Sequence, residues 1–255
     1  MKRLQRINRS FLLWTVTVMV NIGLAHGAFA IPTLQLDIAG GVYDPVTETI
    51  VSSSDSFTLY AYLIPSGGST LSTTYYISAA IAPKVGPAPS SLGSFVFGGT
   101  PVNATSDMVY GVPPIEVSGT AAHDGGDLGK HDIFETYFKQ FAFTFNPTNR
   151  ADAYNTETSP GTGPTPNPAG TMYYASFVVD AGGLASGDGL HFDLYNTKIV
   201  QKKNNPAIDI DINDFAPFSH DAESCKGCAQ VPEPASLLLL GSGLLGLGLL
   251  KRNSR

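Results

Sequence analysis

The sequence contains few of the residues that most often build catalytic and metal centres. Its 255 residues include 2 cysteines, 5 histidines and 1 tryptophan, and 14% of them are charged. It has no Gly-x-Ser-x-Gly segment, no His-Glu-x-x-His segment and no glycine loop of the phosphate-binding type. The residue counts do not exclude a Ser-His-Asp catalytic triad, because such a triad is defined by the geometry of its side chains. We therefore expect a protein that is not an enzyme, and keep a secreted hydrolase as the weakest alternative.

An apolar segment stands near each end of the chain, and the first has the features of a leader. The first nine residues carry four basic side chains and no acidic one, and an apolar run from Phe11 to Leu24 follows. Ala28 and Ala30 then give the small-x-small pattern that a signal peptidase cleaves. We expect a signal peptide over residues 1–30, cleaved before Ile31. A retained anchor is the alternative, but the apolar run is short for a membrane span.

The second apolar segment, 235–250, lies between a proline motif and a basic cluster. It follows Pro232-Glu233-Pro234 and precedes the basic residues of 251–255. The segment has 16 residues. A helix of that length spans about 24 Å, slightly less than the roughly 30 Å of a bilayer core. We expect a transmembrane helix over 235–250, with its basic end in the cytoplasm and residues 31–234 on the far side of the membrane.

The proline motif, the short apolar helix and the basic cluster, in this order, resemble the PEP-CTERM sorting signal of Gram-negative bacteria. The resemblance covers residues 232–255 and implies recognition by an exosortase. This membrane enzyme would cut near Pro232-Glu233-Pro234 and pass the protein to the cell surface or the extracellular matrix. The membrane anchor would then be transient. An ordinary single-span anchor, in which the prolines only end the helix, is the alternative.

Acidic residues dominate the part of the chain between the two apolar segments. All 21 acidic residues lie in 31–234, whereas only 8 of the 15 basic residues do, so this part has a net charge of −13. Such a charge repels nucleic acids and anionic lipid surfaces. We expect no nucleic-acid partner, and the charge is compatible with cation binding.

Short runs of β-branched and aromatic residues, separated by Gly, Pro, Asn, Asp and Ser, dominate residues 31–223. They predict an all-β ectodomain, a single β-sandwich of the Ig-like or jelly-roll-like kind. A linker with two cysteines, 224–231, and the sorting signal, 232–255, follow it. The expected strands are Leu34–Ile38, Phe57–Ile64, Thr74–Ile81, Ser94–Phe97, Tyr137–Phe145, Met172–Val179, Leu190–Tyr195 and Ile208–Ile212.

Two segments within this domain have a distinctive composition. Alternate positions of Phe141–Phe145 are all phenylalanine, which predicts a buried stripe on one face of a strand rather than a platform for ligands. Thr156–Gly170 is rich in proline and glycine, so we expect a long surface loop inside one domain rather than a linker between two.

Three further stretches look similar to the choice-of-anchor N proteins, a group of surface proteins with alternative anchoring signals. The first is Leu34–Asp37 leading to Ser56–Leu59, the second is Tyr137–Phe143, and the third is Phe215–Glu223. The resemblance is spread over most of residues 31–223. It implies a family and a surface location, and no activity.

A calcium site is the sharpest site hypothesis in the sequence. Asp209, Asp211, Asn213 and Asp214 supply side-chain oxygens, and calcium takes six to eight oxygen ligands. The segment departs from an EF-hand loop, because Asp214 replaces the glycine of the turn and His220 replaces the bidentate glutamate. We expect no cofactor apart from this possible calcium ion.

The alternative for the same segment is an edge strand with one wet face. Ile208, Ile210 and Ile212 alternate with the acidic residues. An extended strand would turn the isoleucines inward and leave the acids in solvent. A second acidic loop, 123–127, is a weaker candidate for a metal site.

Cys225 and Cys228 form a Cys-x-x-Cys pair just before the sorting signal. No thioredoxin-like pattern precedes them, and Ala229 replaces the histidine of a haem attachment signature. Zinc would need two further ligands, of which His220 is the nearest candidate. In an oxidising compartment we expect a local disulfide between the two cysteines.

These features favour an exported surface or extracellular-matrix protein with a structural or adhesive role in biofilm or exopolysaccharide. Its expected partners are signal peptidase and exosortase during export, and matrix components afterwards. A glycan- or calcium-binding surface module is the alternative. The lack of tryptophan in residues 31–234 weakens the hypothesis of glycan binding, because sugar rings commonly stack on tryptophan.

Overall fold

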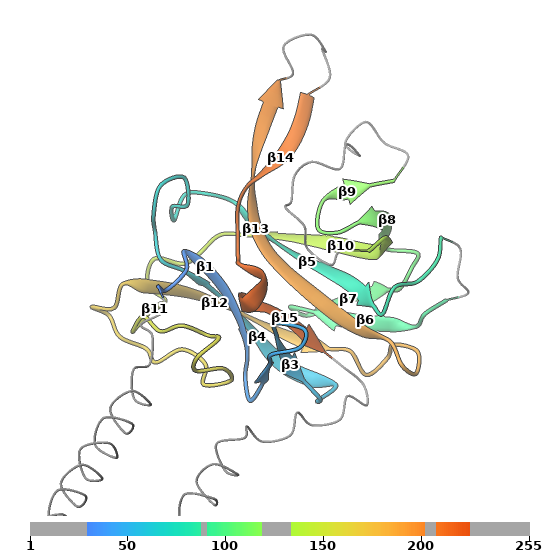
Figure 1. The fold of residues 1–255 in the computed structure, drawn as a ribbon, viewed down its shortest axis with the longest axis horizontal. Helices are drawn as coiled ribbons and strands as arrows, with labels where there is room; N and C mark the ends of the chain where they lie inside the picture. The colour runs from blue at the N-terminus through green and yellow to red at the C-terminus, as the bar shows by residue number, and fades with distance from the viewer. Residues whose placement is uncertain (1–29, 88–90, 119–133, 202–207, 225–255) are drawn as a thin grey trace, which may run out of the picture. The chain divides into compact units, whose positions relative to one another are not determined.

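Two β-sheets packed on a common core form the domain (Figure 1). The computed structural model describes residues 30–87, 91–118, 134–201 and 208–224. Within these ranges every regular element is a β-strand, apart from one 3₁₀ turn, η1, at Phe218–His220. The predicted all-β fold is confirmed. The predicted signal helix and the predicted helix over 235–250 lie outside the described residues.

The first sheet has six strands and contains the best-predicted elements. Its order is β1-β4-β12-β6-β7, and β11 pairs with β12. All pairs in it are antiparallel. The strands are β1 (Leu34–Ile38), β4 (Ser56–Leu63), β6 (Ser94–Phe97), β7 (Thr100–Asn103), β11 (Arg150–Ala151) and β12 (Met172–Asp180).

The second sheet has nine strands and contains one parallel pair. Its order is β2-β3-β15-β13-β5-β10-β8-β9, and β14 pairs with β13. The parallel pair is β15 with β3. The strands are β2 (Val42–Asp44), β3 (Thr49–Ser52), β5 (Tyr75–Ala82), β8 (Val109–Val112), β9 (Glu116–Val117), β10 (Thr136–Phe143), β13 (Gly189–Gln201), β14 (Ile208–Phe215) and β15 (Asp221–Ser224).

The core is rich in aromatic rings that come from both sheets. Phe97 of β6 is 3% exposed, and its ring stacks on Phe141 of β10 with 4.1 Å between centroids and on Phe177 of β12 with 5.1 Å. Phe143 and the buried Phe145 also pack in this core. The rings of the predicted phenylalanine stripe thus face the core, Phe141 and Phe143 partly buried on β10 and Phe145 buried just beyond its end.

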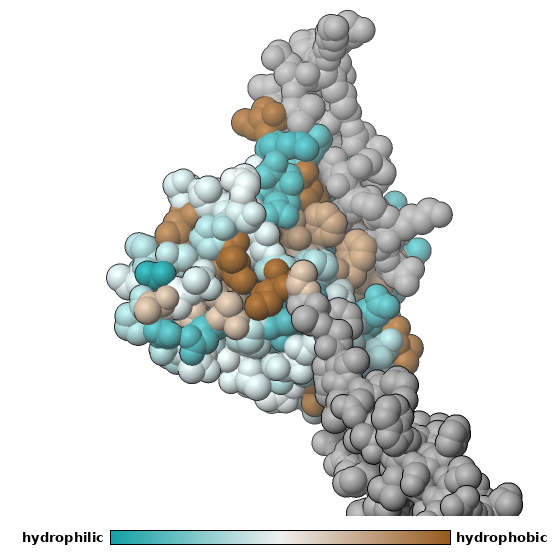
Figure 2. All heavy atoms as spheres, turned by 60° about the vertical axis from the view of Figure 1, so that its left-hand side comes forward, coloured by the Kyte–Doolittle hydropathy of each residue, from teal (hydrophilic) through white to brown (hydrophobic). Residues whose placement is uncertain are grey.

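The distal halves of β13 and β14 form a hairpin that extends beyond the neighbouring strands (Figure 1). Ile199 and Ile210 are opposite each other in this hairpin, and they are 76% and 47% exposed. Ile212, nearer the sheet, is buried. The predicted inward orientation is therefore wrong at Ile210, because this part of the hairpin leaves the packed sandwich. On the face drawn in Figure 2, apolar residues lie in separate small groups.

A loop between β11 and β12 covers the outer face of the six-stranded sheet. Gln35 and Asp37 of β1 lie on this face and are fully buried. The side-chain oxygen of Gln35 accepts the N–H of Thr156, and Asp37 accepts the N–H groups of Gly161 and Gly163. The proline- and glycine-rich segment is thus fixed to the sheet by buried side chains.

Candidate functional site

The predicted calcium residues lie along the extended strand β14. Asp214 Oδ2 accepts a hydrogen bond from Ser69 Oγ at 2.5 Å, and Asn213 Nδ2 donates to Asn196 Oδ1 at 3.0 Å. Asp211 lies opposite Lys198 of β13, and Asp209 lies further along the same strand. The side chains of Asn213 and Asp214 are thus engaged with separate partners, Asn196 and Ser69, and the calcium site stays a prediction.

Most of the other predicted site residues lie outside the described residues. They are Ala28, the loop 123–127, Cys225, Cys228 and the motif Pro232-Glu233-Pro234. Ala30 is described and is exposed without regular structure. Among the described residues, no helix has the length and apolarity that a membrane crossing needs.

An imidazole and three carboxylates meet on the outer face of the nine-stranded sheet. Alternate residues of β13 point into the core, which leaves His191 and Asp193 on the outer face. On the adjacent β15, Glu223 is directly opposite His191, and Asp221 lies two residues further along the same face. We call these four residues the His191 cluster. It exists because β15 pairs with β13.

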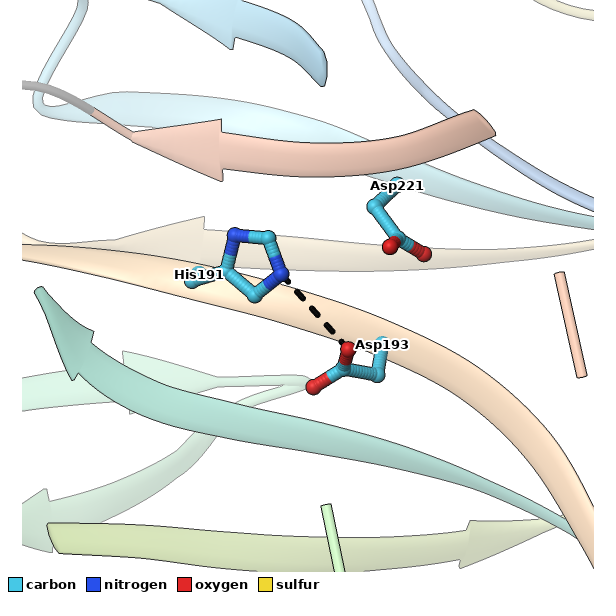
Figure 3. A group of neighbouring side chains, drawn as sticks. All are labelled: His191, Asp193 and Asp221. Atoms are coloured by element: carbon cyan, nitrogen blue, oxygen red, sulfur yellow. Dashed lines mark ion pairs between the residues drawn. The ribbon is translucent and has the colours of Figure 1, made fainter. Parts of the chain in front are cut away.

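Figure 3 shows the side chains of His191, Asp193 and Asp221 turned toward one another. One ligand atom from each of the three lies within 4.8 Å of the others. His191 Nε2 is 3.5 Å from Asp193 Oδ1, and His191 Nδ1 is 3.5 Å from Glu223 Oε2. The two aspartates are 6% and 2% exposed, respectively. Their charges therefore require a cation close by.

In the absence of another cation, the proton on His191 supplies that positive charge. Burial by itself lowers the pKa of His191, but the carboxylates of Asp193, Glu223 and Asp221 raise it well above the ordinary value of 6.5. The imidazole is therefore doubly protonated at neutral pH. One imidazolium faces three carboxylates in the cluster.

A loop before β9 covers the cluster from outside. The carbonyl oxygen of Pro114 accepts hydrogen bonds from the hydroxyl of Tyr195 at 3.1 Å and from Nε2 of Gln140 at 3.0 Å. Pro114, Tyr195, Asp193 and Asp221 line a cavity of about 10 Å³. This volume is near the minimum for one water molecule, so an organic substrate does not fit.

A second polar group links η1 to the loop after β11. Ser219 Oγ lies 2.8 Å from His220 Nδ1, and His220 Nε2 lies 3.1 Å from Asn155 Oδ1. Burial lowers the pKa of His220 to about 4, so the ring is neutral at pH 7. Asn155 Oδ1 also accepts the N–H groups of Glu157 and Thr158. His220 thus links η1 to the loop after β11 through these hydrogen bonds.

The sequence predictions missed the His191 cluster, because its members come from two distant segments. A local signal was present in each segment. His191 and Asp193 alternate with apolar residues, and Asp221 and Glu223 flank an alanine. Each pair is typical of a strand with one polar face, but nothing in either segment indicates that the two strands pair.

Comparisons with known proteins identify the C-terminal segment. Residues 230–252 match the family model of the PEP-CTERM protein-sorting motif. No curated protein and no solved structure matches the chain. The resemblance to the choice-of-anchor N proteins stays a prediction. The matched range contains Pro232-Glu233-Pro234 and the whole apolar segment after it. The chain therefore carries a PEP-CTERM protein-sorting motif, which implies export and processing by an exosortase.

Proposed function

We propose that the exported domain has a structural or adhesive role in the extracellular matrix, where it contacts exopolysaccharide or other matrix components. The sorting motif at 230–252 carries this proposal, because exosortase-dependent sorting directs a protein to the surface. The all-β architecture supports it, since two sheets packed on one core form a stable scaffold. Its charge of −13 disfavours nucleic acids and anionic lipids as alternative partners.

The β13–β14 hairpin is the surface that best fits an adhesive role. Ile199 and Ile210 form an exposed apolar pair across it. Among the described strands, β14 pairs with β13 alone. A strand at the end of a sheet that carries exposed apolar side chains can pair with another chain. The exposed isoleucine pair on this hairpin therefore favours a contact with a partner.

Replacement of both hairpin isoleucines by aspartate is expected to reduce retention in the matrix several-fold, because charge opposes apolar contact and strand pairing. The measurement is the fraction of protein that stays with isolated biofilm matrix after washing. Both side chains are exposed, so the melting temperature should change little. Val178→Asp, at a 61% exposed position on β12, is the matched control. Equal retention of the hairpin variant and the control would contradict an adhesive hairpin.

Alanine substitution of Pro232, Glu233 and Pro234 is expected to block processing, because the exosortase no longer recognises its site. The protein should then accumulate in the inner-membrane fraction with residues 237–250 still attached, as intact-mass measurement can detect. Pro168→Ala, in the domain, is the control and should be processed normally. Release of the triple variant in the same cut form as the wild type would refute dependence on the motif.

A secreted hydrolase is the second candidate, and the hydrogen bond between Ser219 and His220 is the observation that favours it. The bond from His220 to Asn155 adds a third member to the group, as in a catalytic triad. The structural proposal expects no turnover of ester or amide substrates. Turnover that is lost in Ser219→Ala and kept in Ser186→Ala would favour the hydrolase instead.

A further inference from the structure

We propose that His191, Asp193 and Asp221 bind one divalent transition-metal ion, zinc in the first instance, on the outer face of the nine-stranded sheet. The site is separate from the calcium segment predicted on β14 and from the two cysteines. It is independent of the adhesive role, since a bound ion could join β15 to β13 whatever the domain contacts.

The spacing of the ligand atoms is close to that of a zinc site. Two ligands about 2.1 Å from a tetrahedral zinc ion are about 3.4 Å apart. His191 Nε2 and Asp193 Oδ1 are separated by 3.5 Å, and one ligand atom from each of His191, Asp193 and Asp221 lies within 4.8 Å of the others. Binding of one ion by all three would draw the ligand atoms closer together, and water would fill the fourth position.

Glu223 occupies the place of an outer-shell partner. A metal-bound histidine almost always donates its other ring N–H to a carboxylate, a carbonyl or water, which fixes the orientation of the ring. With the ion on Nε2 of His191, its Nδ1–H points to Glu223 Oε2 at 3.5 Å. The cluster therefore has three ligands and an orienting carboxylate.

Ser78 gives an independent sign of a missing ligand at the same place. It is directly opposite Asp193 on the neighbouring strand β5, so both side chains project from the same face. Ser78 is fully buried, and its Oγ has no hydrogen-bond partner among the described residues. A buried hydroxyl without a partner is costly. A water molecule on the metal ion would supply one.

The size and charge of the site favour a small divalent cation over other ligands. The cavity next to Asp193 and Asp221, about 10 Å³, has room for about one water molecule and not for an organic ligand. The cluster holds three carboxylates and one imidazole, so a divalent ion balances more charge than a proton on His191. An imidazole ligand favours zinc and related ions over calcium, which takes oxygen ligands.

The test uses the full chain with Cys225→Ser and Cys228→Ser, purified in detergent and stripped with chelator, so that thiols cannot bind the metal. Titration calorimetry and elemental analysis should give one zinc ion per chain. Asp221→Asn is expected to weaken zinc binding at least about 100-fold, and Glu223→Gln about 10-fold. Asp180→Asn, the same change at an exposed position of β12, should bind as the parent does.

Two outcomes would overturn the proposal: no saturable zinc binding to the folded parent, or equal affinity of Asp221→Asn and the parent. If Asp221→Asn fails to fold, the zinc affinities of Glu223→Gln and of the parent are compared instead. Saturating zinc must then raise the melting temperature of the parent. Cobalt substituted at the site must give the visible spectrum of nitrogen and oxygen ligation. Absence of either effect rejects the site.

Discussion

Replacement of Phe97 by alanine is expected to lower the free energy of unfolding by about 4 kcal/mol, the usual cost of removing a buried phenylalanine ring. The ring of Phe97 contacts Phe177 within its own sheet and Phe141 and Phe192 in the facing sheet, with centroids 5.1, 4.1 and 6.3 Å away. Its loss leaves a cavity between the sheets that rigid strands cannot close. Urea denaturation followed by far-ultraviolet circular dichroism measures the effect.

Phe215→Ala is the matched control for this prediction. Phe215 loses the same atoms but is 37% exposed and packs on Phe218 at the base of the hairpin. We expect it to cost less than about 1.5 kcal/mol, because part of the ring is already in water. Equal losses for the two variants would mean that the aromatic contacts between the sheets do not dominate stability.

Asp37→Ala is expected to lower the free energy of unfolding by about 3 kcal/mol. Asp37 Oδ1 accepts the N–H of Gly161 at 2.7 Å, and Oδ2 accepts the hydroxyl of Tyr154 at 3.0 Å and the N–H of Gly163 at 3.3 Å. Alanine leaves the N–H groups of Gly161 and Gly163 without this acceptor in a covered site, at roughly 1–3 kcal/mol for each that water does not reach, whereas Tyr154 keeps its bond to the hydroxyl of Tyr62. Asp180→Ala, at an exposed position, should cost less than about 1 kcal/mol.

Asp37→Asn separates the charge of this side chain from its hydrogen bonds. Asparagine keeps one acceptor oxygen, so its stability at pH 7 should fall between those of the wild type and Asp37→Ala. Burial raises the pKa of Asp37 above 3.8, although its hydrogen bonds partly oppose the shift. The folded state therefore binds a proton at a pH where the unfolded chain does not. The wild type should gain stability relative to Asp37→Asn as the pH falls through the raised pKa toward 3.8. The opposite slope would contradict the direction of the shift.

The strands that the sequence predicted best are those with clear alternation or a long apolar run. Leu34–Ile38 and Ser94–Phe97 are strands with those bounds, and the other predicted strands differ mainly at their ends. The strands of two to four residues, such as β9 and β15, were not predicted apart from β6. These strands are too short to show an alternating pattern in the sequence, and they form only where a neighbouring strand pairs with them.

The burial of β1 shows why a local pattern was insufficient elsewhere. Its polar residues Gln35 and Asp37 alternate with core residues, and both are fully buried on the outer face. The cover comes from a loop more than a hundred residues away, and polar side chains in β1 satisfy the backbone of that loop. The His191 cluster depends in the same way on the pairing of β15 with β13. Such long-range contacts depend on which strands and loops become neighbours in the fold, and the sequence of one segment does not show this.

The position of β15 has a mechanical consequence for a protein held by its C-terminal tail. β15 ends at Ser224, and the sorting motif begins only a few residues later. It is hydrogen-bonded on both sides, to β3 in parallel and to β13 in antiparallel orientation. A pull on the tail along the strand axis therefore shears two ladders at once instead of peeling an edge strand bond by bond. While the tail is still in the membrane, the domain meets tension at an inner strand of its larger sheet.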